Sequence, residues 1–84
     1  MLQATFAVLR QILLDLGFTM RVEPGVFVRF DHADSDTWFV FRPHEDDEAV
    51  NAPNLAGVRR ILDEKGLLPS KQFEELLRQR VVAG

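Results

Sequence analysis

Apolar side chains recur through the first sixteen residues at the spacing of a helix. Successive members lie four, three, four and three residues apart: Leu2, Phe6, Leu9, Leu13 and Leu16. Residues at these intervals share one side of an α-helix, which would face a core. Gly17 follows, and glycine commonly takes the left-handed conformation just beyond a helix end. The pattern therefore predicts a helix over about residues 2–16.

The chain then changes to the period of two that is typical of strands. Residues 18–22 alternate weakly, and residues 23–25, Glu-Pro-Gly, are a turn signal. In the next five residues alternate side chains fall on opposite faces of a strand, with Val26, Val28 and Phe30 on one face and Phe27 and Arg29 on the other. The segment predicts a β-hairpin.

A third strand is predicted after a polar loop at residues 31–36. Residues 37–42 are rich in β-branched and aromatic side chains, and Pro43 ends the pairing because proline has no N–H to donate. Three antiparallel strands are the simplest arrangement. Residues 44–53 contain four consecutive acids, and we interpret them as a solvated loop with breakers at Asn51 and Pro53.

Two further helices are predicted in the last third of the chain. Asn54 can cap a helix over about 55–65, in which Leu55, Val58, Ile61 and Leu62 share a face and after which Gly66 follows. Ser70 can cap a last helix over about 70–82, whose apolar face is marked by Phe73, Leu76 and Leu77.

The predicted fold class is α+β. Its elements follow the order α-β-β-β-α, with a three-stranded antiparallel sheet packed on helices and an added C-terminal helix. The 84 residues are fewer than a typical domain of about 100–150. We therefore expect residues 1–84 to form a single domain.

Charge is distributed unevenly along the chain. The net charge is −3, and residues 31–53 hold one basic and seven acidic side chains, whereas residues 54–84 hold six basic and four acidic ones. General nucleic-acid binding depends on Lys and Arg neutralising phosphates. The acidic middle segment therefore disfavours RNA as a partner without excluding it.

The composition also bears on compartment and cofactors. The chain contains no Cys, which rules out disulfides and thiolate metal sites and fits a reducing compartment. The first sixteen residues carry Arg10 and Asp15 within the apolar pattern, and they resemble neither a signal peptide nor a membrane span. We therefore expect a cytoplasmic protein with no membrane partner and no cofactor.

Candidate metal and acid–base residues lie around the predicted third strand. Asp31, Asp34 and Asp36 do not fit the calcium-loop spacing, which needs acids at positions one, three and five and a Gly at six. His32 and His44 could act as acid–base groups or zinc ligands, but two His twelve residues apart without Cys indicate ordinary surface residues. We predict no metal site.

Aromatic and arginine side chains interleave along the predicted strands. Four aromatic residues alternate with two arginines and could stack on single-stranded RNA: Phe27, Trp38, Phe39 and Phe41 with Arg29 and Arg42. The alternative is that the strand aromatics form the core, because one sheet face must cover the helices. No Gly-rich phosphate loop, Gly-x-Ser-x-Gly or His-Glu-x-x-His motif occurs. An enzymatic function is therefore left uncertain, with a ribonuclease as the class to consider.

The order of these segments resembles the HicA toxin family over about residues 5–68. The resemblance includes an apolar helix ending in Leu-Gly-Phe at 16–18, two aromatic strands, and the run Val-Arg-Arg-Ile-Leu at 58–62 followed by Gly-Leu at 66–67. It implies a double-stranded-RNA-binding-like fold, RNA cleavage, and neutralisation by a HicB antitoxin. The family's motif Gly-Ser-His aligns with Gly25, so Val26 replaces the serine and Phe27 replaces the catalytic histidine.

Three functions are compatible with this pattern. The first is a non-catalytic HicA-like protein-interaction module of toxin–antitoxin ancestry, whose partner is a HicB-like antitoxin or a second copy. The others are an RNA-binding or RNA-cleaving domain, and a structural homo-oligomer held through the last helix. We assign no catalytic residue, and the candidate binding residues are Phe27, Arg29, His32, Arg42, His44, Asp46 and Asp47.

Overall fold

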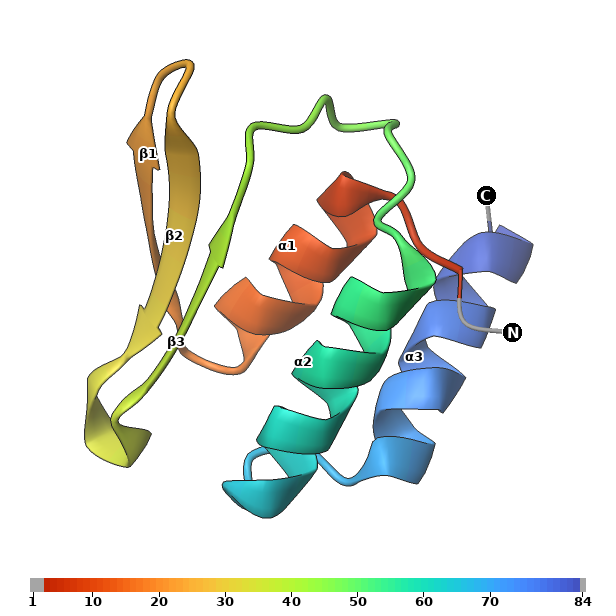
Figure 1. The fold of residues 1–84 in the computed structure, drawn as a ribbon. Coiled ribbons are helices and arrows are strands. Elements are labelled where there is room, and N and C mark those ends of the chain that lie inside the picture. Colours follow the sequence, from red (N-terminus) through yellow and green to blue (C-terminus); the bar gives the residue numbers. More distant parts are fainter. Residues whose placement is uncertain (1–2, 84) are drawn as a thin grey trace.

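The computed structural model describes residues 3–83, and within the last helix it describes side chains up to residue 79. Three helices and three strands follow one another in the predicted α+β order. Figure 1 shows the sheet on one side of the molecule and all three helices on the other. The bounds are α1 Phe6–Asp15, β1 Thr19–Glu23, β2 Phe27–His32, β3 Thr37–Phe41, α2 Ala52–Glu64 and α3 Ser70–Ala83.

Helix α1 is shorter than its apolar stripe predicted. It begins at Phe6, and the Thr5 side chain caps it by accepting a hydrogen bond from the Val8 N–H at 3.3 Å. Thr5 also forms an antiparallel bridge with Ala49, so the residues before the helix are extended. This pairing with a distant segment overrides the local helical pattern, and Leu2 lies outside the described residues.

The sheet is antiparallel with the strand order β1-β2-β3. Its register places Arg21 opposite Arg29 and Arg29 opposite Val40. Val26 lies in the β1–β2 turn, where its N–H donates to the Glu23 carbonyl at 2.9 Å, so it does not join the strand face predicted for it. The predicted loop at 31–36 is also shorter, because β2 continues to His32 and a 3₁₀ turn occupies residues 33–35.

The caps of the last two helices differ from those predicted. Helix α2 begins at Ala52, and the Asn51 side chain caps it by accepting from the Asn54 N–H at 2.8 Å. Pro53 is therefore inside the first turn, where proline is tolerated, and is not a breaker. Ser70 donates its backbone N–H and its hydroxyl to Asp63 of α2, so the cap of α3 comes from another helix.

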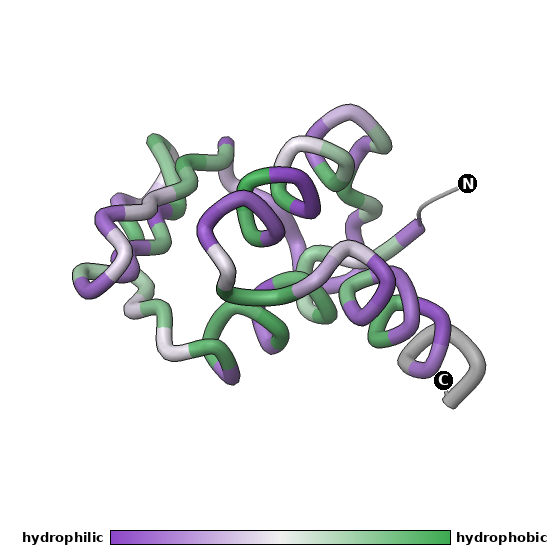
Figure 2. The backbone as a smooth tube through the Cα atoms, turned by 90° about the horizontal axis from the view of Figure 1, so that it is seen from below, coloured by the Kyte–Doolittle hydropathy of each residue, from purple (hydrophilic) through white to green (hydrophobic). Residues whose placement is uncertain are grey.

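One cluster of buried side chains lies between the sheet and the helices. Its fully buried members come from β2, α1, α2 and α3, and they include Phe30, Leu9, Leu62 and Phe73. Each helix carries both hydrophobic and hydrophilic segments, coloured green and purple in Figure 2, as amphipathic helices do. Helix α3 thus contributes to the same core as the sheet.

Candidate functional site

The face of the sheet that points away from the helices is a candidate binding surface. Val28 and Phe30 of β2 and Phe39 and Phe41 of β3 are buried toward the helices. Alternate residues therefore point the other way, and all three helices lie on the opposite side of the sheet in Figure 1. We call this surface the outer sheet face, and the strand register assigns these residues to it: Thr19, Arg21, Glu23, Phe27, Arg29, Asp31, Trp38 and Val40.

Aromatic rings and guanidinium groups lie against each other on the outer sheet face. Trp38 is 54% exposed, and the Arg29 Cζ lies 5.6 Å from the centre of its ring. The Arg21 Cζ lies 5.8 Å from the centre of the Phe27 ring. Contacts of this kind attract a cation to the ring face. The two pairs hold the large side chains of the face in defined positions.

The outer sheet face carries little free positive charge. The Arg29 guanidinium bonds the Asp31 carboxylate through Nε at 2.9 Å and through a terminal nitrogen at 2.9 Å. Arg42, just after β3, forms an ion pair with Glu48 and donates to the Pro43 carbonyl. Arg29 and Arg42 are therefore already bound to carboxylates of the same chain. Arg21 lies against the Phe27 ring and shares the face with the acidic Glu23.

The structure separates the four strand aromatics that the sequence grouped together. Phe39 and Phe41 belong to the core, whereas Phe27 and Trp38 lie on the outer sheet face. Only two of the four rings that could stack on single-stranded RNA therefore lie on this face. Arg21 and Val40, also on this face, were not identified from the sequence, although the alternation of β3 carries the signal for Val40.

The predicted acidic loop packs its backbone against the start of α1. The Phe6 N–H donates to the Glu48 carbonyl at 2.9 Å, and the Ala7 N–H donates to the Asp46 carbonyl at 3.0 Å. These donors belong to the first turn of α1, where backbone N–H groups have no partner within the helix. The loop is therefore a cap for α1 as well as a solvated segment. Figure 1 shows it passing beside the start of α1.

Ion pairs and a ring contact hold the same loop in place. Arg10 of α1 bonds Asp46 at 2.7 Å, and His44 stacks on Phe6 with ring centres 4.9 Å apart.

The hydrogen bond from Arg10 lowers the pKa of Asp46 below its ordinary value. The bond from Arg42, with a further one from the Glu45 N–H, lowers the pKa of Glu48. Asp47 lies exposed in this loop.

Acid should therefore release the loop. A carboxyl with a pKa lowered by folding stabilises the fold above its unfolded pKa, and this contribution is lost as the pH falls through the folded pKa. We expect the free energy of unfolding to fall as the pH drops below about 4.5, the ordinary value for Glu48. Urea unfolding between pH 3 and pH 7 measures this dependence.

Variants assign this pH dependence to particular carboxylates. Glu48→Gln and Asp46→Asn should each flatten the acid limb, which is the fall in the free energy of unfolding at low pH. Each variant removes one titrating group that has an arginine partner. Asp47→Asn is the matched control in the same loop and should leave the limb unchanged. An acid limb that stays as steep in both Glu48→Gln and Asp46→Asn as in the wild type would contradict the assignment.

His32 lies at the other end of the sheet from this loop. Its Nδ1 is 2.8 Å from the Ser35 hydroxyl, which donates to the Thr37 hydroxyl at 2.8 Å. Its ring packs on Phe18 with centres 5.1 Å apart. These contacts close the 3₁₀ turn between β2 and β3. The structure thus does not bring His32 together with His44, Asp46 and Asp47, and within residues 3–83 no three metal-ligating side chains cluster.

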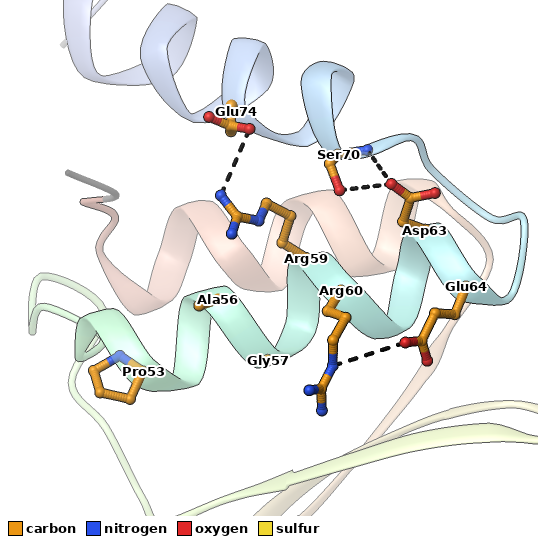
Figure 3. Close-up of a pocket in the computed structure, with 9 residues that line it drawn as sticks. All are labelled: Pro53, Ala56, Gly57, Arg59, Arg60, Asp63, Glu64, Ser70 and Glu74. Carbon is orange, nitrogen blue, oxygen red and sulfur yellow. Dashed lines mark hydrogen bonds and ion pairs between the residues drawn. The ribbon is translucent and has the colours of Figure 1, made fainter.

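A shallow depression lies along α2 and the start of α3, with a volume of about 760 Å³. Figure 3 shows that its charged side chains pair with one another. Arg59 lies 3.6 Å from Glu74, and Arg60 lies 3.9 Å from Glu64. The bonds from Ser70 lower the pKa of Asp63. These contacts join α2 to α3 and leave the depression with no concentrated charge.

Comparisons with known proteins do not assign this chain to a family. Among the described residues, no helix has the length and apolar character needed to cross a bilayer. No protein-family model matches this chain, and the comparisons with curated proteins and with solved structures give no match either. The resemblance to the HicA family therefore rests on the sequence features alone.

Proposed function

We propose that this protein is a non-catalytic protein-interaction module that binds its partner through the outer sheet face. The observation that carries the proposal is the exposure of Trp38, half of whose surface is open on a sheet face that no helix of the described residues covers. Trp and Arg are the side chains most enriched at the energetic centres of protein interfaces. Arg29 of the central strand β2 lies against the ring of Trp38 in the neighbouring strand β3.

The charges of the face favour a protein over a nucleic acid. Arg29 and Arg42 are bound to Asp31 and Glu48, and the chain has a net charge of −3. Binding to phosphates would require these ion pairs to break or to be shared. A protein surface of mixed charge can meet the same side chains without that cost.

The HicA-like ancestry suggests the class of partner and the lack of catalysis. Phe27 stands where the resemblance places the catalytic histidine, and a phenyl ring cannot transfer a proton. A HicB-like antitoxin or a second copy is the partner that this ancestry favours. The absence of Cys fits a reducing compartment, and we place the protein in the cytoplasm.

RNA binding is the second candidate function, and one observation favours it. The stacked pairs Arg29–Trp38 and Arg21–Phe27 offer two aromatic positions on one sheet face, as single-strand-binding sheets do. In this case the acidic loop would have to lie away from the RNA.

A titration with RNA distinguishes the two functions. We expect neither single-stranded nor structured RNA to bind at low salt or to be cleaved, because Arg29 and Arg42 are each paired with a carboxylate and Arg21 shares its face with Glu23. Fluorescence anisotropy of labelled RNA at several salt concentrations gives the measurement. Binding that weakens steeply with salt and is lost in Arg29→Ala would instead establish the RNA-binding function.

A further inference from the structure

Strand β1 forms an open edge of the sheet. It lies first in the order β1-β2-β3, so one of its sides pairs with no strand among the described residues. All five of its residues are exposed, including Met20 at 41% and Val22 at 49%, which point toward the side of the helices. Figure 1 shows β1 at the margin of the sheet farthest from α2 and α3.

The other edge strand, β3, leaves no apolar side chain uncovered on the side of the helices. In β3 the residues that face the helices are buried, including Phe39 and Phe41. β1 thus combines an unfilled row of backbone hydrogen-bonding groups with uncovered apolar side chains. An edge of this kind is a template for another strand. The charges of Arg21 and Glu23 determine which partner strand is complementary to this edge.

We propose that β1 pairs antiparallel with β1 of a second copy, about a two-fold axis at Val22. In such a pair each residue is opposite the one whose number sums with its own to 44, so Arg21 of each copy is opposite Glu23 of the other. Opposite charges directly across a strand pair are stabilising. The same axis places Val22 against its own counterpart.

Neighbouring registers lack this complementarity. An axis at Arg21 would place two arginines opposite each other, which destabilises a strand pair. An axis at Met20 would place Arg21 opposite Thr19 and Glu23 opposite Gly17, so it would form no ion pair. Of these three registers, the axis at Val22 alone gives two ion pairs and an apolar contact. The charges of β1 therefore select a second copy and one register.

The resulting assembly is a six-stranded sheet with a small interface. With the axis at Val22 the two strands overlap over residues 21–23, about 10 Å at ~3.4 Å per residue, so the contact is at the small end of specific interfaces. We expect a dimer that dissociates on dilution. This inference is independent of the proposed function, because Trp38 lies on β3 and stays open in the dimer.

The mass in solution tests the dimer. Sedimentation equilibrium of the full chain from a few micromolar to about 1 mM should show the mass rising from 9.6 kDa toward twice that value. Arg21→Glu and Glu23→Arg should each stay monomeric, because each places like charges opposite one another. Lys71→Glu, at an exposed position of α3, makes the same change of charge away from β1 and should still dimerise.

Mixing the two charge variants tests the register. An equimolar mixture of Arg21→Glu and Glu23→Arg restores opposite charges at both positions, and we expect the dimer to return in the mixture. Circular dichroism of each variant confirms folding beforehand. A wild type that stays monomeric at 1 mM, a dimer insensitive to both variants, or monomeric variants that do not recombine would each overturn the proposal.

Discussion

Replacing Phe73 with alanine should remove a large part of the stability of this protein. Phe73 is fully buried in α3, within the cluster that also contains Phe30 and Leu62. Truncating a buried phenylalanine costs about 3–5 kcal/mol, through lost burial and the cavity that remains. A chain of 84 residues has a total free energy of unfolding of roughly 4–13 kcal/mol. Urea unfolding followed by circular dichroism measures the loss.

The control for this prediction is one position away on the same helix. Gln72 is exposed, so Gln72→Ala should change the free energy of unfolding by no more than about 0.5 kcal/mol. The prediction also separates two roles of α3. If the helix held copies together through an exposed apolar face, Phe73→Ala would change the mass in solution and leave the unfolding of the monomer nearly unchanged.

Local patterns were enough to predict the elements but not where they begin. The stripe containing Leu9 and Leu13 identified α1, because a helical period depends only on neighbouring residues. Its start depends on Thr5, which bridges to Ala49, and a contact over that separation leaves no local pattern. Likewise, Asn51 and Asn54 are both good caps, and the choice between them depends on where the preceding loop docks on α1.

The candidate site was likewise only partly predictable from local patterns. Alternation in β3 establishes that Trp38 and Val40 share one face and that Phe39 and Phe41 share the other. It does not establish which face the helices cover, since both contain large apolar side chains. The position of α1 and α2 decides this, and it buries two phenylalanines while leaving the tryptophan open.

Replacing Trp38 with alanine should strongly weaken partner binding without damaging the fold. Trp38 is half exposed, so its removal should change the free energy of unfolding by at most about 1 kcal/mol. A tryptophan at the centre of an interface contributes about 2 kcal/mol or more, and that energy corresponds to at least a ~30-fold loss of affinity. The partner is first captured by chemical crosslinking in the cells that make the protein, identified by mass spectrometry, and titrated by calorimetry.

Two further measurements make this result specific to the outer sheet face. The chain has one Trp and no Tyr, so the fluorescence of Trp38 reports on this face alone. Its emission should shift to shorter wavelength when the partner covers the ring and excludes water. Lys71→Ala changes an exposed position of α3, and this variant should bind the partner with wild-type affinity. A partner that binds the Trp38→Ala variant as tightly as the wild type, with no shift in the wild-type emission, would place the interaction on another surface.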